Sequence, residues 1–429
     1  MTKKPTVVAG LRLRRLMEIP APPITLPQKD YLQYNHTDSC SPYRWTARES
    51  YQFMYARPWQ MVNDFYSDAV NGRRSLSELF GKQVGFTTCT IHDDAENVED
   101  CNQSVSGPAA ERTGKWARVT FKIVLSYHGS SFDGWQKQPN LNTVQGLVES
   151  SLGKFVDEKK MQLLKEKKLP IDVCSVVAGR TDKGVTALNQ VCSFYTWRKD
   201  VMAQDIENAI NDITPGKIRA ISVSKVSREF HPNFAAKWRH YLYIFPLHDE
   251  IVDDEASQCK KDRYEQCVSE KNCRDVVDDD FRNEQDTRKK PTSFEVNRVN
   301  NLLNQLEGKL LSYKIFARDT KASRNVGPPT ECFVFHARAS EANLLCDEDG
   351  TIKKTMCVEL VANRFLRKMV RVLVATAVRE AAAGAEDDML LKLMDATCRR
   401  ATAPPAPPDG LCLLGVGYTD FDRKYCLIL

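Results

Sequence analysis

The chain has 429 residues, with 61 Lys and Arg against 56 Asp and Glu and a formal net charge of +5. A hydrophobic content of 42% and an aromatic content of 9% exclude a disordered or fibrous chain and predict two or three folding units. The small positive excess permits nucleic-acid binding without arguing for it. None of the 14 cysteines forms a C-x-x-C pair. The cluster Cys259, Cys267 and Cys273 fits no common zinc pattern, so we expect reduced thiols, an intracellular protein and no metal site.

The two ends carry few targeting signals. No apolar run approaches the length of a membrane span, and no secretory signal is present. Basic residues precede the first acid, Glu18, which leaves an organelle (mitochondrion or chloroplast) as the alternative to the nucleus or cytoplasm. The last four residues begin at Cys426 and match a prenylation motif, although an ordinary terminal strand or tail is the favoured interpretation.

The first half of the chain divides into an extension and a regular unit. Residues 1–115 have weak periodicity and predict a partly disordered extension. From residue 116 the pattern changes, and alternating apolar residues predict a strand over 117–127. Thr143 is positioned to cap a helix whose apolar stripe runs over 144–156. The elements expected next are strands on both sides of Asp182, a helix over 201–213 and strands over 217–225 and 234–246.

The second half follows an interruption. Residues 248–292 are polar and acidic and predict an inserted, disordered loop. Regular elements then return within 293–429. They are a helix over 294–311, strands over 330–338 and 355–363, helices over 365–382 and 386–399 and a strand over 411–418. This interleaving of helices and strands predicts an α+β fold with units at 116–247 and 293–429.

Asp182 is the first candidate functional residue. It lies within Ala178–Val185, between two apolar runs, and Gly179 and Gly184 flank it. Glycines permit backbone conformations that other residues avoid, so we expect Asp182 at a tight turn between buried strands. A carboxylate held there is either the cap of a turn or the centre of an active site.

Arg371 is the second candidate. It lies inside an apolar run from Met369 to Ala377, and a buried guanidinium needs an acid to face it. Asp182 is the natural partner, and a nearby cation favours a charged carboxylate. The alternative is that Arg371 continues a basic stripe that faces solvent or RNA. That stripe consists of Arg364, Arg367 and Lys368. The sequence leaves both interpretations open.

The third candidate is a strand face. Arg239, Tyr241, Tyr243 and Phe245 alternate and share one side of a strand. Rings beside a cation suit base stacking, although an ordinary aromatic face packed on a helix is the commoner case. Neither a G-x-G-x-x-G nor a Walker pattern is present, and no zinc deaminase signature occurs.

Five segments in chain order resemble the TruA-type tRNA pseudouridine synthases. They are Tyr127–Gln136 with Thr143–Gly146, Gly179–Val191, Phe230–Tyr243, Asn363–Arg371 and Ala403–Leu411. The resemblance covers about residues 117–420 and is interrupted by the acidic insertion. It implies two ferredoxin-like α/β subdomains that share a mostly antiparallel central sheet, with a catalytic cleft between them.

The resemblance also implies roles. Asp182 becomes the catalytic carboxylate, Arg371 its ion-pair partner and Tyr241 the ring over the uracil and the proton acceptor. Arg180 would fill the space of the flipped base, and the family needs no metal or cofactor. Further substrate-binding residues, some of them on the tRNA-binding surface, are Arg239, Tyr243, Arg364, Arg367 and Lys368.

Some positions depart from the family pattern. His128 and Thr186 replace commoner residues, the region from Tyr313 to Arg324 fits the pattern poorly, and Lys183 is similar to eukaryotic members. These departures leave the modified uridine, other RNA substrates and a homodimer open. The alternative function is a non-catalytic RNA-binding or tRNA-folding protein on the same scaffold. A binding module has no need for Asp182, Tyr241 and Arg371 together, which favours the enzyme.

Overall fold

The computed structural model describes residues 36–81, 118–171, 173–247, 289–318, 329–345, 350–396 and 398–429. The expected disorder of 1–115 and 248–292 therefore falls mostly outside the described residues. Within the extension, 36–81 form regular structure, including helices α1 (Ala47–Tyr55) and α2 (Trp59–Val70).

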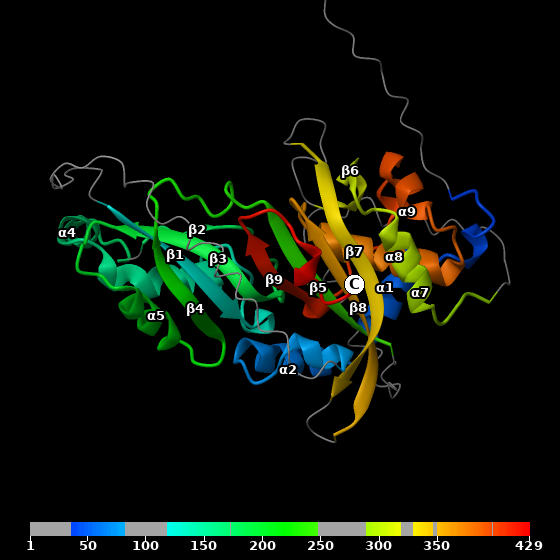
Figure 1. The fold of residues 1–429 in the computed structure, drawn as a ribbon, viewed down its shortest axis with the longest axis horizontal. Helices are drawn as coiled ribbons and strands as arrows, with labels where there is room; N and C mark the ends of the chain where they lie inside the picture. Colours follow the sequence, from blue (N-terminus) through cyan, green and yellow to red (C-terminus); the bar gives the residue numbers. More distant parts are fainter. Residues whose placement is uncertain are drawn as a thin grey trace, which may run out of the picture.

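A single large sheet organises the described part of the chain (Figure 1). The strand order is β4-β1-β3-β9-β5-β8-β7-β6, and β2 pairs with β3 off this path. The strands are β1 (Val119–Tyr127), β2 (Val176–Val177), β3 (Thr186–Thr196), β4 (Ile218–Val226), β5 (Trp238–Pro246), β6 (Lys309–Ser312), β7 (Glu331–Leu345), β8 (Ile352–Ala362) and β9 (Leu411–Gly417). The β3–β9 pair is parallel and the other pairs are antiparallel. The α+β class and the mostly antiparallel sheet are thus confirmed.

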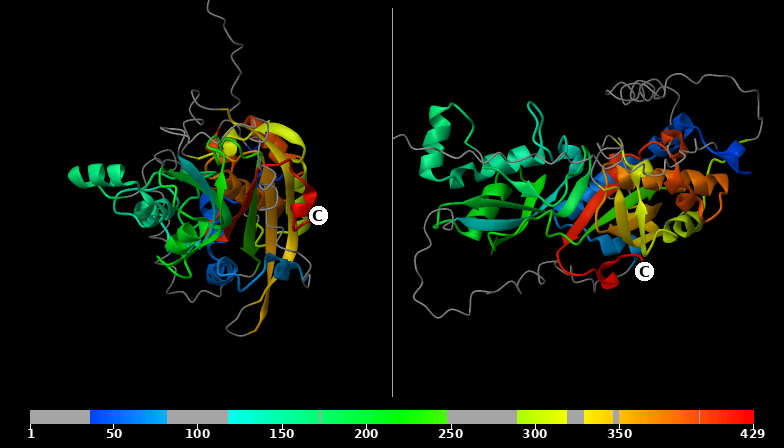
Figure 2. Two further views of the ribbon diagram at one scale, coloured as in Figure 1. Left: turned by 60° about the vertical axis from the view of Figure 1, so that its left-hand side comes forward. Right: turned by 90° about the horizontal axis from the view of Figure 1, so that it is seen from above.

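Apart from α2, which lies along the middle of the sheet, the helices gather at the two ends of an elongated molecule (Figures 1 and 2). One end holds α3 (Val144–Ser151), α4 (Glu158–Glu166) and α5 (Ala203–Asn211). The other end holds α7 (Val296–Asn304), α8 (Met369–Ala383) and α9 (Met389–Lys392), with α1 beside them. No helix in the described ranges is both long and apolar enough to cross a bilayer.

Two apolar cores lie on one face of the sheet and meet at Tyr241. The first packs α3 and α5 on β1 and β3, and the second packs α7 and α8 on β5, β7 and β8. Tyr241 is partly buried and contacts both cores. On the opposite face, Val62 and Tyr66 of α2 pack against Leu242 and Cys412. Successive side chains of β5 therefore point to opposite faces of the sheet, as expected for a strand.

The sheet has a narrow seam between β3 and β9. Their parallel pairing covers only Thr186 with Cys412 and Ala187 with Leu413. On its other side β9 pairs with β5 over a longer stretch. Since Asp182 precedes β3 and Pro408 precedes β9, the loops that lead into both strands meet at one point of the seam.

Several predicted boundaries are wrong. The helix expected over 365–382 begins at Met369, because Lys368 takes a left-handed φ of 59° that helical backbone does not allow. The helix expected over 294–311 ends at Asn304, and Gly308, with φ +69°, turns the chain into β6. The helix expected over 386–399 is reduced to α9 and short 3-10 turns.

Helices α1, α2 and α4 were not predicted. A readable signal did exist for α1. Thr46 and Glu49 form a capping box, in which each side chain accepts a hydrogen bond from the other's backbone N–H.

Candidate active site

The loop between β2 and β3 carries Asp182 and is fixed by backbone contacts. The N–H of Val185 donates to the carbonyl of Asp182 at 3.2 Å, which closes a tight turn. Thr181 accepts from the N–H of Trp135 at 3.1 Å, and its hydroxyl lies 2.8 Å from the hydroxyl of buried Tyr127. The predicted turn at Asp182 is therefore confirmed, but the expected buried strand before it is wrong, because β2 has only two residues and neither is buried.

The two flanking glycines differ in what they do. Gly184 has φ +82°, and a Cβ there would lie 2.9 Å from Cγ of Pro408. Gly179 has no such φ, and a Cβ there would meet no atom within 4 Å. The prediction of a special backbone conformation is confirmed for Gly184 and wrong for Gly179.

Arg371 faces Asp182 from the first turn of α8. Its Nη1 lies 3.7 Å from Asp182 Oδ2, and its Nε donates to the carbonyl of Ala406 at 2.6 Å. The Arg371 side chain is 10% exposed and that of Asp182 is 27% exposed, so the carboxylate is the accessible member of the pair. Of the two interpretations that the sequence left open, the structure has the one in which Arg371 faces Asp182.

A second cation approaches Asp182 from the opposite oxygen. Arg367 Nε lies 3.8 Å from Oδ1, on a side chain that is about half exposed. Arg367 belongs to the loop before α8, together with Arg364 and Lys368. The sequence had suggested a basic stripe on a helix as one alternative. These three residues do not form one, because they lie in a loop.

Tyr241 on β5 supplies an aromatic ring near the carboxylate. Phe365 meets it edge to face at a centroid distance of 5.1 Å. Burial raises the pKa of Tyr241 to about 12, with the charge of Asp182 adding to the rise and Arg239 opposing it. The hydroxyl is therefore protonated at neutral pH and is a hydrogen-bond donor in the free protein.

Arg239 and Tyr243 support the site rather than line it. The guanidinium of Arg239 donates to the carbonyls of Ala178 and Asn363 at 3.0 and 2.7 Å, and to Asn233 Oδ1 at 2.7 Å. Tyr243 is wholly buried, and its hydroxyl donates to the carbonyl of Pro407 at 2.9 Å. Both side chains are thus engaged by protein carbonyls, and their contact with substrate stays a prediction.

The remaining predicted residue is Arg180, whose side chain is exposed. It lies in the same loop as Asp182, two residues before it.

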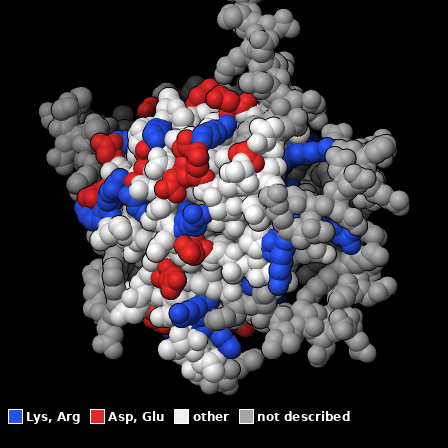
Figure 3. All heavy atoms as spheres, turned by 90° about the vertical axis from the view of Figure 1, so that its right-hand side faces the viewer, with Lys and Arg blue, Asp and Glu red and all other residues white. Residues whose placement is uncertain are grey.

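The end of the molecule beyond α7 and α9 mixes acidic and basic side chains over the part of its surface that is drawn in colour (Figure 3). A single-sign field suited to phosphates is not visible on that face. The loop cations around Asp182 are thus the better candidates for contact with an anionic ligand.

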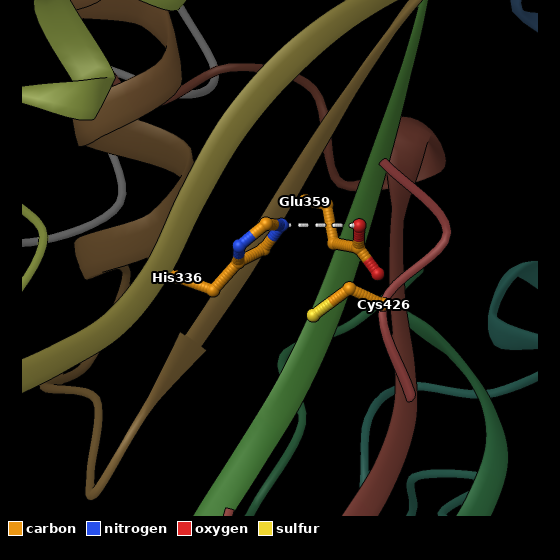
Figure 4. A group of neighbouring side chains, drawn as sticks. All are labelled: His336, Glu359 and Cys426. Carbon is orange, nitrogen blue, oxygen red and sulfur yellow. Dashed lines mark ion pairs between the residues drawn. The ribbon is translucent and has the colours of Figure 1, made fainter. Parts of the chain in front are cut away.

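One buried cluster has the composition of a metal site. Ligand atoms of His336, Glu359 and Cys426 lie within 4.8 Å of one another, from β7, β8 and the segment after β9 (Figure 4). Glu359 already accepts hydrogen bonds from the N–H groups of Leu427 and Ile428, at 2.8 and 2.7 Å. His240 Nε2 lies 2.6 Å from the same carboxylate. The carboxylate is thus occupied by protein groups, and we assign the cluster to anchoring residues 426–428.

The charges of this cluster compensate one another. Burial by itself would lower the pKa of His336, but its contacts with Cys426, Glu307 and Glu359 raise it to about 11. Burial would likewise raise the pKa of Glu359, but the hydrogen bond with His240 and the ion pair with His336 lower it to about 2. A cationic histidine thus faces an ionised glutamate at neutral pH.

Comparison with known proteins adds the family. A family model described as tRNA pseudouridine synthase matches residues 278–419. A protein named tRNA pseudouridine synthase A from Ehrlichia canis is 41% identical over 127 residues, which are 29% of this chain and 46% of that protein. Proteins of the same name from Chlorobaculum tepidum and Gluconobacter oxydans are 27% and 25% identical over 303 and 336 residues.

The extent of these alignments differs. The chain spans about half the length of the Ehrlichia protein, as it does for the Dictyoglomus thermophilum relative, at 49%. The longer alignments cover 70% and 75% of this chain and 99% and 98% of the Chlorobaculum and Gluconobacter proteins. The chain is thus similar, over most of its length, to proteins named tRNA pseudouridine synthase A.

Proposed function

We propose that this protein isomerises specific uridines of tRNA to pseudouridine. The observation that carries the proposal is the pair formed by Asp182 and Arg371. It combines an accessible carboxylate with a nearly buried guanidinium that is held in place by a backbone carbonyl. Similarity to proteins named tRNA pseudouridine synthase supports the same reaction.

In this reaction the bond from ribose C1′ to uracil N1 breaks, and the ring turns and rejoins C1′ through C5. The C5 proton is lost and N1 gains one, so the product is an isomer. The carboxylate of Asp182 serves by attacking C1′ or by removing a ribose proton. We assign to Tyr241 the ring contact with uracil, because its protonated hydroxyl would have to lose its own proton before it accepted another.

The same proposal assigns roles to the two halves of the fold and to the cations around the site. Residues 116–247 and 293–429 form two ferredoxin-like subdomains, and their cleft lies at the β3–β9 seam. The target nucleotide leaves its stack to reach Asp182, and Arg180 fills the vacated space. Arg364, Arg367 and Lys368 contact phosphates, which makes binding salt-sensitive rather than sequence-specific.

Tritium release from unmodified tRNA transcripts that contain 5-[³H]uridine tests the proposal. We expect release by the wild type and at least a roughly 10³-fold loss for Asp182→Asn, because the amide cannot act as nucleophile or base. Asp200→Asn removes an exposed carboxylate paired with Arg198 and serves as the matched control. Full turnover by Asp182→Asn contradicts the catalytic assignment. RNA binding by the wild type without release indicates the non-catalytic alternative.

A further inference from the structure

Phe234 is the feature that the site described so far does not use. It lies in the loop between β4 and β5, and 81% of its surface is exposed. Its ring stacks on His231 at a centroid distance of 4.1 Å and an interplanar angle of 25°. One face of a two-ring stack is therefore presented to solvent.

The loop holds this stack in a fixed orientation. His231 Nδ1 accepts from the N–H groups of Asn233 and Phe234 at 3.3 and 3.2 Å, which requires the ring proton to sit on Nε2. The Pro232 carbonyl accepts from the hydroxyl of Tyr418 at 3.0 Å. The N–H of Ala235 donates to the His231 carbonyl at 2.9 Å. An exposed aromatic ring is thus preorganised by its own loop.

The same loop is tied to the candidate active site through Arg239. One guanidinium nitrogen of Arg239 donates both to Asn233, the residue before Phe234, and to the carbonyl of Ala178. Ala178 lies two residues before Arg180 and four before Asp182. The other terminal nitrogen donates to the carbonyl of Asn363, next to Arg364. The platform and the two cationic loops are therefore held by a single side chain.

We propose that the Phe234–His231 pair is a stacking platform for an unpaired base of the RNA, next to the nucleotide that enters the Asp182 site. The proposal rests on the proposed function. Every base has an aromatic face, so such a platform binds and positions RNA without selecting a sequence. Two cations lie on either side of the Arg239 anchor, exposed Arg180 and half-buried Arg364, and they match the phosphates that flank a splayed base.

Substitution of Phe234 separates stacking from charge. With the unmodified tRNA transcripts as the probe, we expect Phe234→Ala to weaken Kd by about 5- to 150-fold. Phe234→Trp should bind as tightly as the wild type. The slope of log Kd against log salt should be unchanged in Phe234→Ala, whereas Arg364→Ala should lower it by about one. The loss should raise KM more than it lowers kcat, since the platform does not touch the reacting atoms.

Tyr195→Ala is the matched control. Tyr195 is an aromatic residue that is 45% exposed, at the end of β3 remote from Asp182. It should leave Kd unchanged, and the thermal midpoint of Phe234→Ala should equal that of the wild type. Wild-type affinity in Phe234→Ala overturns the platform. A change confined to the oligomeric state in sedimentation also overturns it and identifies a second copy of the chain as the occupant. The proposed function fails separately, through turnover by Asp182→Asn.

Discussion

Arg371 connects Asp182 to the carbonyl of Ala406, with Nη1 3.7 Å from the carboxylate and Nε 2.6 Å from the carbonyl oxygen. The carbonyl belongs to the proline-rich turn that leads into β9. One buried guanidinium therefore sets the distance between the Asp182 loop and this turn.

Arg371→Lys tests this connection. Lysine keeps the charge but cannot donate in two fixed directions, so the carboxylate loses its position. We expect kcat to fall by about 100-fold, the effect of a misplacement near 1 Å, and the measurement is single-turnover tritium release. Arg367→Ala is the comparison, because an exposed ion pair contributes only about 0–1 kcal/mol. Equal losses in the two variants would contradict a special role for Arg371.

The two glycines beside Asp182 should respond differently to alanine. Gly184→Ala should destabilise the fold by about 1–2 kcal/mol, because alanine resists the left-handed region and its Cβ meets Pro408. Gly179→Ala should leave stability within about 0.5 kcal/mol of the wild type, since its Cβ meets no atom. Urea denaturation of both variants provides the measurement. A larger loss in Gly179→Ala would show that the turn is misassigned.

Arg239→Lys should destabilise the protein by at least about 2 kcal/mol. Lysine cannot serve the carbonyls of Ala178 and Asn363 and the side chain of Asn233 together, and each hydrogen bond to a charged group contributes about 1.5–3 kcal/mol. Chemical denaturation measures the loss. Lys237→Ala removes an exposed pair with Asp420 and should be nearly neutral. Wild-type stability in Arg239→Lys would count against the anchor.

His336 predicts how stability depends on pH. Its pKa is raised from 6.5 to about 11 in the fold, so its contribution is complete below pH 6.5 and declines as the pH rises toward 11. Glu359, lowered from 4.5 to about 2, contributes above pH 4.5 and loses that contribution as the pH falls toward 2. We expect His336→Gln to flatten the alkaline decline in a pH series of urea denaturations. Parallel curves for variant and wild type would refute the ion pair.

The sequence allowed prediction of elements that have a strong local pattern. The strand β1 and the Thr143 cap of α3 appear in the structure as expected, although β1 is buried on both faces rather than on one. The ends of elements were missed where a backbone conformation sets them. One example is Lys368, whose left-handed φ leaves no pattern in the neighbouring side chains. The long reach of β7 to Leu345 and the lone turn of α9 depend on tertiary packing that periodicity does not contain.

The candidate site shows the same division. Asp182, Arg371 and Tyr241 were found because a charge or ring stands out in an apolar context. The acceptor at Ala406 was missed, since a backbone carbonyl has no signature in the sequence. For Arg239 and Tyr243, strand alternation gave the face of each side chain but not the protein carbonyls that it contacts.

The narrow seam at β9 has a consequence for folding. The last strand in sequence order is inserted between β3 and β5, which were synthesised more than 160 residues earlier. Until β9 arrives, both strands present open edges that can pair with other chains. The carbonyl that orients Arg371 arrives at the same late moment. A nascent chain therefore joins the β4-β1-β3 and β5-β8-β7-β6 parts of its sheet only near the end of translation, and we expect it to depend on chaperones up to that point.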